Sequence, residues 1–296
     1  MSASTSFVEE CLGYRVLSCL DENDNTSGPF RTFLVSDPRT RNIYTLKHVQ
    51  RTSGEAPLRR LLHEHEISGR FHHACLRGGG RLRRERGGMR VSELGALLPF
   101  VDGQRFNRWQ PSTAAAFFDA CVDLADGLAH LHDRGVVHGA VAPEHVLVDD
   151  LGAPTLIGFG EANDLGAAGS ARPDAWDCVR APEVARGDAR TARTDLFGLA
   201  ATMFTLVAGR SIIEQRETLA LAREIDLQDW HESIRRELAT RCPIASLRKL
   251  LAACLEPDPR KRPVDAASVG ATLRSLRGVA AVRFDRQEPG TAVVAA

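Results

Sequence analysis

The chain has 296 residues, enough to bury a substantial core in one large domain or in two smaller lobes. Hydrophobic residues make up 43% of it and charged residues 26%, an ordinary balance for a globular protein. The formal net charge is zero, which excludes a global field that would favour nucleic acid or an anionic membrane. Nearly all basic residues are arginine, and this bias, with abundant alanine and glycine, indicates a GC-rich bacterial genome.

The seven cysteines are scattered, without CxxC pairs or tight cysteine–histidine spacing. We therefore expect neither a disulfide framework nor a zinc site, and a reducing cytosol fits best. The histidines at 63, 65, 72 and 73 are expected to line a solvated helix face, with metal binding as the alternative. The opening MSASTSFVEECLGY lacks a signal-peptide pattern, and no apolar run approaches the ~20 residues of a membrane span. We expect a cytoplasmic protein without a membrane segment.

The first third of the chain is predicted to form strands and one helix. Apolar and polar residues alternate over 14–20, 30–37 and 42–49, and turn-rich pieces separate these stretches. Residues 55–71 then carry apolar side chains at helical spacing. Residues 92–103 are predicted to form a buried strand that runs into a turn.

The segment RGGGRLRRERGGMR, residues 77–90, is rich in arginine and glycine and has almost nothing to bury. We expect a flexible loop here. A nucleic-acid-binding patch is the alternative, but the segment lacks the interleaved aromatic residues on which bases stack. Nucleic acid is therefore not the expected partner.

Beyond residue 103 the chain is predicted to be mainly helical. An amphipathic helix is expected over 114–135, ending at a glycine. The apolar runs HVLV and PTLIGF predict a small hairpin after it. Further helices are expected at 194–209, around 215–238, at 247–255 and at 264–276, and the tail from 278 is expected to be loosely ordered.

Five short motifs, in this order and spacing, resemble the eukaryotic-type (Ser/Thr) protein kinase fold over about residues 12–277. They are the lysine-bearing strand motif YTLKHV (44–49), the helix GLAHLHDRGVVH (127–138) that leads into a catalytic loop, RAPEVARG (180–187), which closes an activation segment, TDLFGLA (194–200), which starts the central helix, and the last motif CLEPDPRKRP (254–263). Each motif alone is weak, and together they are specific.

The resemblance implies an α+β, two-lobed fold, in which a small antiparallel sheet with one helix is followed by a larger, mainly helical lobe. It divides the chain into an N-terminal extension (1–11), a small lobe (12–101), a helical lobe (102–277) and a tail (278–296).

The residues that hold such a fold together are present. By resemblance, Glu183 and Arg262 form a largely buried ion pair, whose disruption would cost several kcal/mol, about 3–5. Asp195 is expected to accept backbone N–H bonds from the loop at 138–140. His138 and Phe159 are expected to stack in the core between the lobes.

The residues that carry out the chemistry are absent. Phosphoryl transfer needs Mg²⁺ and a carboxylate that orients the attacking hydroxyl. The resemblance places Ala140 at the catalytic aspartate, Ala142 at the lysine beside the γ-phosphate, His145 at the metal-binding asparagine and Gly158 at the metal-binding aspartate. Loss of a positioned acid or base alone costs about 10²–10⁴ in rate. We expect no metal site and no Mg-ATP cofactor.

The nucleotide pocket is altered as well. Phe33 and Thr45 stand, by resemblance, at two adenine-lining positions that are small in the family, so Phe33 is expected to fill part of the purine space. Lys47 and Glu64 are expected to form a salt bridge between helix and sheet, with residual metal-free nucleotide binding as the alternative. The remnants of the pocket are Lys47, Glu64, Gly28, Phe33, Thr45, Leu98, Val101 and Leu147.

The activation segment, residues 161–179, contains one hydroxyl residue, Ser170. The arginine that receives a phosphate in the family is replaced here by Gly139. Switching by phosphorylation of this segment is therefore not expected.

Two functions follow as hypotheses. The first is a pseudokinase of bacterial type, which acts as a scaffold or allosteric regulator by binding another protein, with an active kinase or a gene-neighbour complex as candidate partners. The second is an unconventional ATP-dependent transferase that uses Glu161 or Asp149 as a substitute carboxylate.

Overall fold

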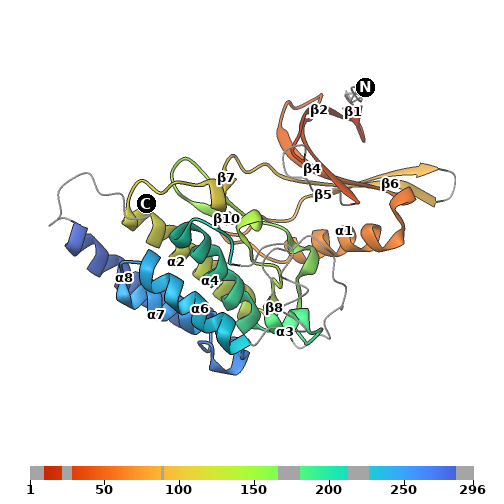
Figure 1. Ribbon diagram of the computed structural model, residues 1–296. Coiled ribbons are helices and arrows are strands. Elements are labelled where there is room, and N and C mark those ends of the chain that lie inside the picture. Colours follow the sequence, from red (N-terminus) through yellow and green to blue (C-terminus); the bar gives the residue numbers. More distant parts are fainter. Residues whose placement is uncertain (1–9, 22–28, 88–89, 166–180, 213–226, 285–296) are drawn as a thin grey trace, which may run out of the picture. The chain divides into compact units, whose positions relative to one another are not determined.

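The structure is a computed structural model that describes residues 10–21, 29–87, 90–165, 181–212 and 227–284. Within it the chain divides into two compact units. The first unit, red to orange in Figure 1, holds a β-sheet and helix α1 and comprises residues up to 72 together with 77–101. The second, yellow to blue, is mainly helical and comprises residues 73–76 and those from 102 onwards.

The first unit confirms the predicted small antiparallel sheet with one helix. The sheet has the strand order β1-β2-β3-β4-β6-β5, and every neighbouring pair is antiparallel. The strands are β1 (Glu10–Cys11), β2 (Tyr14–Cys19), β3 (Phe30–Ser36), β4 (Ile43–Gln50), β5 (Arg81–Gly87) and β6 (Arg90–Pro99). A 3₁₀ turn (Arg51–Ser53) connects β4 to α1 (Glu55–Ser68).

The sheet buries apolar side chains on both of its faces, because successive residues of a strand point to opposite sides. One face carries a cluster that includes Val35, Leu46 and Leu97. On the other face, Val49 and Leu98 pack with Leu61 of α1. Since both faces are packed, a slip of one residue in any strand would exchange the two clusters, and the register is therefore fixed.

The segment predicted to be a flexible arginine-rich loop is instead an edge strand. Within 77–90, residues Arg81–Gly87 form β5 and pair with β6, while 88–89 lie outside the described residues. The prediction was wrong because a strand at an edge needs backbone pairing and few apolar side chains, and charged residues are common there. Leu82 packs with the cluster that faces α1. Arg83 donates two hydrogen bonds to the Tyr14 hydroxyl, at 2.6 and 3.0 Å.

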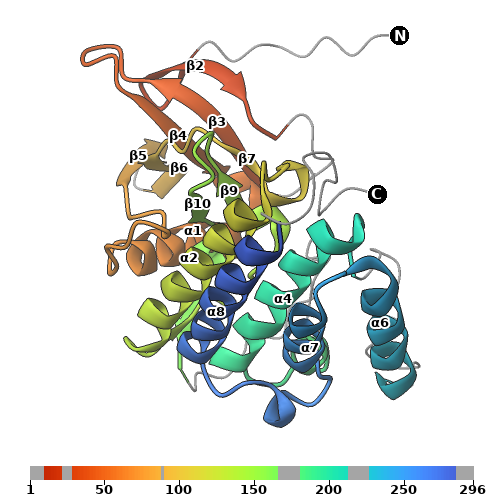
Figure 2. The same cartoon turned by 90° about the vertical axis from the view of Figure 1, so that its left-hand side faces the viewer.

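The second unit is mainly helical, as predicted. Its helices are α2 (Ala114–His132), α3 (Pro182–Ala185), α4 (Ala192–Ala208), α6 (Leu227–Arg241), α7 (Ala245–Cys254) and α8 (Ala266–Phe284). Figure 2 shows α8, in dark blue, running beside α2 in yellow-green, and the two helices contact each other along their length. Helix α8 runs to 284, past the predicted end at 276. The expected helix around 215–238 is described only from 227, where α6 begins.

Short strands and 3₁₀ turns of the second unit shape the loops between its helices. The predicted hairpin is present as β9 (Val146–Val148) and β10 (Pro154–Leu156), with β7 (Gln104–Arg105) on its other side. A separate pair joins β8 (Val136–Val137) to β11 (Asn163–Asp164). The 3₁₀ turns are η2 (Phe106–Arg108), η3 (Pro143–His145), η4 (Phe159–Glu161) and η5 (Pro259–Lys261).

The first turn of helix α4 contains buried polar residues. Thr191 and Thr194 form a reciprocal capping box at its beginning, and Gly209 ends it in the left-handed conformation, with φ 72°. Asp195 lies in the first turn and is buried. The helix therefore presents a buried carboxylate to the loop that follows β8.

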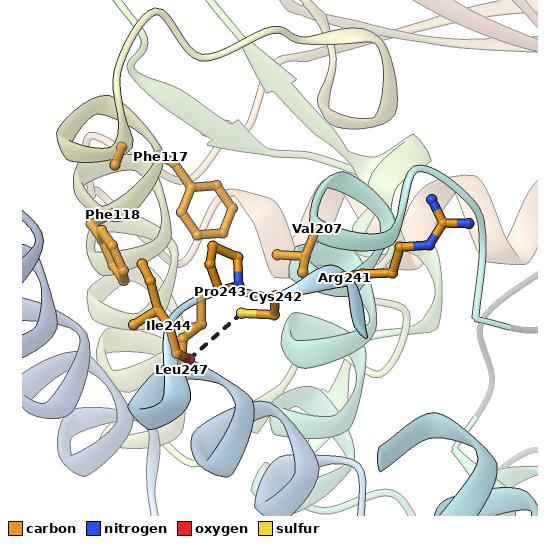
Figure 3. A pocket seen from close by; sticks show the side chains of 9 residues that line it. Phe117, Phe118, Val207, Arg241, Cys242, Pro243, Ile244 and Leu247 are labelled. Carbon is orange, nitrogen blue, oxygen red and sulfur yellow. Dashed lines mark hydrogen bonds between the residues drawn. The ribbon is translucent and has the colours of Figure 1, made fainter. Parts of the chain in front are cut away.

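Figure 3 shows a small pocket in the second unit, between the start of α2, the end of α4 and the connection from α6 to α7. Its lining is mostly apolar and includes Phe117, Val207 and Pro243, while Cys242 contacts the Ile244 carbonyl. Its lining includes Arg241 but no carboxylate or imidazole, so it offers no group for acid–base chemistry near neutral pH. None of the helices in the described ranges is both long and apolar enough to cross a bilayer.

Candidate functional site

The loop that follows β8 is held in place by the carboxylate of Asp195, in the first turn of α4. One carboxylate oxygen accepts a hydrogen bond from the His138 backbone N–H at 2.8 Å, and the other accepts one from Gly139 at 2.7 Å. The first oxygen also contacts the His132 ring at 2.8 Å. The predicted role of Asp195 is confirmed, and the carboxylate fixes the loop backbone in place.

His138 fixes the next part of the loop. Its Nδ1 accepts a hydrogen bond from the Ala140 backbone N–H at 3.3 Å, so the other ring nitrogen carries the proton. That nitrogen, Nε2, donates to the carbonyl of Ile157 at 3.1 Å. The ring meets Phe159 edge-on, with centroids 4.9 Å apart and planes 69° apart. The predicted stacking is confirmed as an edge-to-face contact.

At the two positions expected to act on the substrate, the loop carries methyl groups. Ala140 and Ala142 are both buried. A methyl group neither orients a hydroxyl nor neutralises a phosphate, so this part of the loop has no acid, base or cation to offer.

The two positions expected to bind metal are in contact with each other. His145 donates from Nδ1 to the carbonyl of Ala140 at 2.7 Å, which aims its ring at Gly158. Gly158 is in the left-handed conformation, with φ 84°. A Cβ atom added there would lie 2.7 Å from His145 Cδ2 and 3.0 Å from Nε2. The imidazole therefore occupies the space that any side chain at 158 would need.

The residues at this site do not fit Mg²⁺. Magnesium takes oxygen ligands in octahedral geometry, and the four expected positions supply two methyl groups, one imidazole and a glycine. Across the described ranges, no three histidine, cysteine or acidic side chains come together as a metal-binding group. No step through a metal ion is assigned to this site.

In the first unit the predicted salt bridge is confirmed. Lys47 Nζ lies 2.6 Å from the Glu64 carboxylate, which joins β4 to α1. Phe30, at the start of β3, places its ring 4.7 Å from the same ammonium, at cation–π distance. Burial lowers the pKa of Arg77, and the nearby Glu64 carboxylate opposes that shift. Phe30 and Arg77 are members of this cluster that no sequence motif indicated.

The expected position of Phe33 is wrong. Phe33 pairs with Leu46 and belongs to the cluster on that face of the sheet, where its ring also approaches His48. Lys47 follows Leu46 and points to the opposite face, because side chains alternate along a strand. On β3 the lysine's face instead carries Thr32, opposite Lys47, and Leu34, opposite Thr45. Phe33 therefore does not fill the space beside Lys47.

The other predicted pocket residues are only partly placed. Thr45 and Leu98 are buried and directly opposite each other on β4 and β6. Val101 ends the first unit, and Leu147 lies on β9 of the second unit. Gly28 lies outside the described residues. Their shared role in a nucleotide pocket stays a prediction.

The predicted ion pair behind the loop is confirmed in full. Arg262 Nη1 and Nη2 donate to the two oxygens of Glu183 at 2.7 and 2.8 Å, and both side chains are almost completely buried. Further donors reach the carbonyls of Glu256 and Arg193. The Thr194 hydroxyl donates to the same carboxylate at 3.0 Å. Every charge in this group is matched by a partner.

The two carboxylates considered as substitutes for the missing acid are both engaged. The Glu161 carboxylate accepts from Arg190 Nη2 at 2.7 Å, and both side chains are largely buried. Asp149 accepts the backbone N–H groups of Leu151 and Ala153 in the turn between β9 and β10. Arg190 is a residue of the site that no sequence motif indicated, since it lies between RAPEVARG and TDLFGLA.

Comparison with known proteins agrees with this geometry. The family described as "Protein kinase domain" matches residues 31–269. The chain is 31% identical over 168 residues to the serine/threonine-protein kinase PknK of Mycobacterium tuberculosis, covering 53% of this chain and 14% of that protein. It is 31% identical over 105 residues to the DNA damage-responsive serine/threonine-protein kinase RqkA of Deinococcus radiodurans, covering 33% of this chain and 15% of that protein.

A plant relative is the L-type lectin-domain containing receptor kinase S.1 of Arabidopsis thaliana, 28% identical over 198 residues, which cover 59% of this chain and 30% of that protein. In all three cases the match spans 30% or less of the relative's own length. The family match extends over most of the chain, and it includes the confirmed pairs Lys47–Glu64 and Glu183–Arg262. The chain belongs to the protein kinase domain family.

Proposed function

We propose that this domain is a catalytically inactive member of its family, a pseudokinase that acts by binding another protein as a scaffold or allosteric regulator. Nucleotide binding is absent, or weak and independent of metal. The partner is an active kinase or the product of a neighbouring gene. The free thiols of the six described cysteines agree with a reducing, cytosolic location.

The contact between His145 and Gly158 is the observation that carries the proposal. A simple loss of one ligand would leave a vacant position that a water molecule or a neighbouring side chain could fill. Here the ring of one position fills the space of the other, at 2.7 Å from a Cβ at 158. The ring is held there by its bond to Ala140. The pair of substitutions is mutually compatible in packing, and neither supplies an oxygen ligand.

The surroundings of Lys47 are compatible with the proposal but do not distinguish it from an active kinase, in which the same lysine–glutamate pair is formed. In phosphoryl transfer a lysine holds phosphate oxygens as a point charge. The Lys47 ammonium already has the Glu64 carboxylate at 2.6 Å and the Phe30 ring at 4.7 Å. These contacts give Lys47 a structural role, which is to tie α1 to the sheet.

The transferase hypothesis is not favoured by any comparable observation. It requires that the carboxylate of Glu161 or of Asp149 be free of other partners and face the substrate. Glu161 neutralises the buried Arg190, and Asp149 caps backbone N–H groups of a turn. Removing either from these partners would leave buried or turn-forming polar groups unsatisfied.

A thermal-shift experiment tests the nucleotide part of the proposal. The protein is heated with ATP alone, with ATP and Mg²⁺, and with ATP and Mn²⁺. Because a ligand that binds only the folded state raises the melting temperature, we expect the metal ions to add no shift. A shift of several degrees that requires either metal would overturn the proposal. The Lys47→Ala variant and the matched Lys249→Ala variant, at an exposed lysine, separate binding at the site from binding elsewhere.

The binding part of the proposal needs a partner found by cross-linking in the source cells and then titrated as a purified protein. We expect the affinity for that partner to be the same for the parent and for Lys47→Ala, because binding does not depend on ATP. An affinity that rises with ATP and metal would contradict this mode of action.

A further inference from the structure

Three segments that are far apart in the chain meet at Gly139. The residue has φ 74°, and a Cβ atom there would lie 2.8 Å from Arg190 Cδ and 2.8 Å from the Glu161 carbonyl oxygen. Separations this short require a neighbour to move, and one of the two neighbours is backbone. The conformation therefore favours glycine at this position, and the lack of space for a Cβ atom adds to that preference in this chain.

Arg190 fills the space beside this glycine. It reaches in from the connection between α3 and α4, and its side chain is 5% exposed. Nη2 lies 2.7 Å from the Glu161 carboxylate, and Nη1 donates to the Glu161 carbonyl at 3.3 Å. One guanidinium thus binds both the side chain and the backbone of the last residue of η4.

The third nitrogen of the Arg190 guanidinium, Nε, makes no such contact. It is buried and has no hydrogen-bond partner among the described residues. The same atom lies 3.4 Å from the Cβ position of Gly139, where there is no side chain to accept a bond. A buried donor without a partner lowers stability. The contacts to Glu161 hold the guanidinium in this position despite that cost.

We propose that Arg190 acts as a built-in lock: it occupies the place of the side chain absent from Gly139 and holds η4 against the loop without any covalent modification. The inference rests on the proposed function, because a domain that presents a constant binding surface has no need of a switch. Beyond η4, the strand pairing of Asn163 with Val137 attaches the same segment to β8. Residues 159–164 are then held beside 136–139 in the unmodified chain.

Hydrogen exchange measures this attachment directly. In phosphatase-treated parent protein, we expect the amides of 159–164 to be protected, since the lock needs no phosphate. In Arg190→Met, which keeps bulk and removes charge, exchange of these amides should rise by about 10-fold or more, because the buried Glu161 loses its partner and the segment opens locally. Glu161→Gln, a milder change, should raise exchange in the same amides by less.

The matched control is Arg186→Met, because Arg186 is an exposed arginine four residues earlier that pairs with Asp188 at the surface. It should leave the exchange of 159–164 unchanged. Protection that is lost on phosphatase treatment would overturn the proposal, and so would protection that survives unchanged in both Arg190→Met and Glu161→Gln.

A pair of glycine substitutions tests the steric part. Gly135 has φ 73°, nearly the same as Gly139, but nothing lies within 4 Å of its Cβ position. Gly135→Ala therefore reports the conformational cost alone. Gly139→Ala should lower the urea midpoint of unfolding further, and an Arg190→Ala background should reduce the difference. Equal midpoints for the two glycine variants would contradict the assignment.

These readouts separate the lock from the proposed inactivity. Neither exchange nor urea unfolding uses nucleotide, so a failure of the lock leaves the thermal-shift result untouched. Conversely, metal-dependent ATP binding would overturn the proposed catalytic inactivity, and the exchange data would still report on the role of Arg190.

Discussion

Two regions of the helical unit handle buried polar groups in opposite ways. Around Glu183, Asp195 and Arg262, which we call the anchor region, each charge meets partners of the opposite charge or backbone donors. Around Ala140, His145 and Gly158, which we call the loop region, the carboxylates and amide of an active kinase are replaced by methyl, imidazole and hydrogen. The anchor region retains the polar groups whose loss would unfold the domain. In the proposed function, the loop region lacks the polar groups whose loss affects only chemistry.

The difference shows which polar residues a fold needs. A buried charge is costly unless it is paired, so a chain that keeps the fold must keep both members of each buried pair. A catalytic carboxylate faces substrate and metal, and removing it relieves like-charge repulsion and desolvation rather than creating an unpaired partner. The anchor region is therefore retained for stability, while the loop region is free to repack.

The largest expected effect comes from breaking the anchor region. Arg262→Leu leaves the Glu183 carboxylate buried without its bidentate partner and should lower the free energy of unfolding by about 3–5 kcal/mol in urea denaturation. Arg260→Leu, two residues earlier, removes an arginine that is 86% exposed and paired at the surface. It should leave the free energy of unfolding almost unchanged, because exposed ion pairs contribute little. Similar losses of unfolding free energy in Arg262→Leu and Arg260→Leu would contradict the special role of the anchor region.

A smaller loss is expected from restoring a family residue in the loop region. Gly158→Asp drives a side chain into the His145 ring and should cost on the order of 1–3 kcal/mol of unfolding free energy. Adding His145→Asn removes the ring, so the double variant should be more stable than the single one. Gly135→Asp, at another positive-φ glycine with open space around it, serves as the control. A double variant that is no more stable than Gly158→Asp would show that the two positions do not compete for space.

The last expected effect is a fall in stability at alkaline pH. Burial raises the pKa of the Cys75 and Cys254 thiols from 9.0 to about 12. In the unfolded chain these thiols ionise near 9.0, while in the folded chain they stay protonated. Their contribution to stability is therefore complete below pH 9 and is lost as the pH rises towards 12.

Urea midpoints measured between pH 8 and 10.5 check this effect. The fall in midpoint should be shallower in Cys254→Ala than in the parent. Parallel slopes for parent and Cys254→Ala would refute the assignment of the alkaline loss to this thiol.

Much of the fold was predictable because its signals are local or lie in ordered motifs. Alternation predicted β2, β3 and β4, and helical spacing predicted α1 and α2. The ion pairs Lys47–Glu64 and Glu183–Arg262 followed from the order of the kinase motifs. These features depend on residue types at fixed separations, which a single sequence displays.

The features that were missed depend on neighbours in space. β5 is held by backbone pairing with β6, which leaves no apolar pattern to read. The face of the sheet on which Phe33 lies depends on the strand register, because a shift of one residue moves each side chain to the opposite face. The contacts of His145 with Gly158, and of Arg190 with Gly139, join residues from different segments, and no motif indicates which residues become neighbours in space. Such compensations become visible only when the backbone places the segments together.

Transfer of the γ-phosphoryl group of radiolabelled ATP is the most direct test of the central claim. The protein is incubated with Mg²⁺ or Mn²⁺, with and without a generic protein substrate, and incorporated label is counted. We expect incorporation no higher than in reactions without the protein, and the same value for Lys47→Ala. Metal-dependent incorporation above that background, lost in Lys47→Ala and kept in Lys249→Ala, would contradict catalytic inactivity.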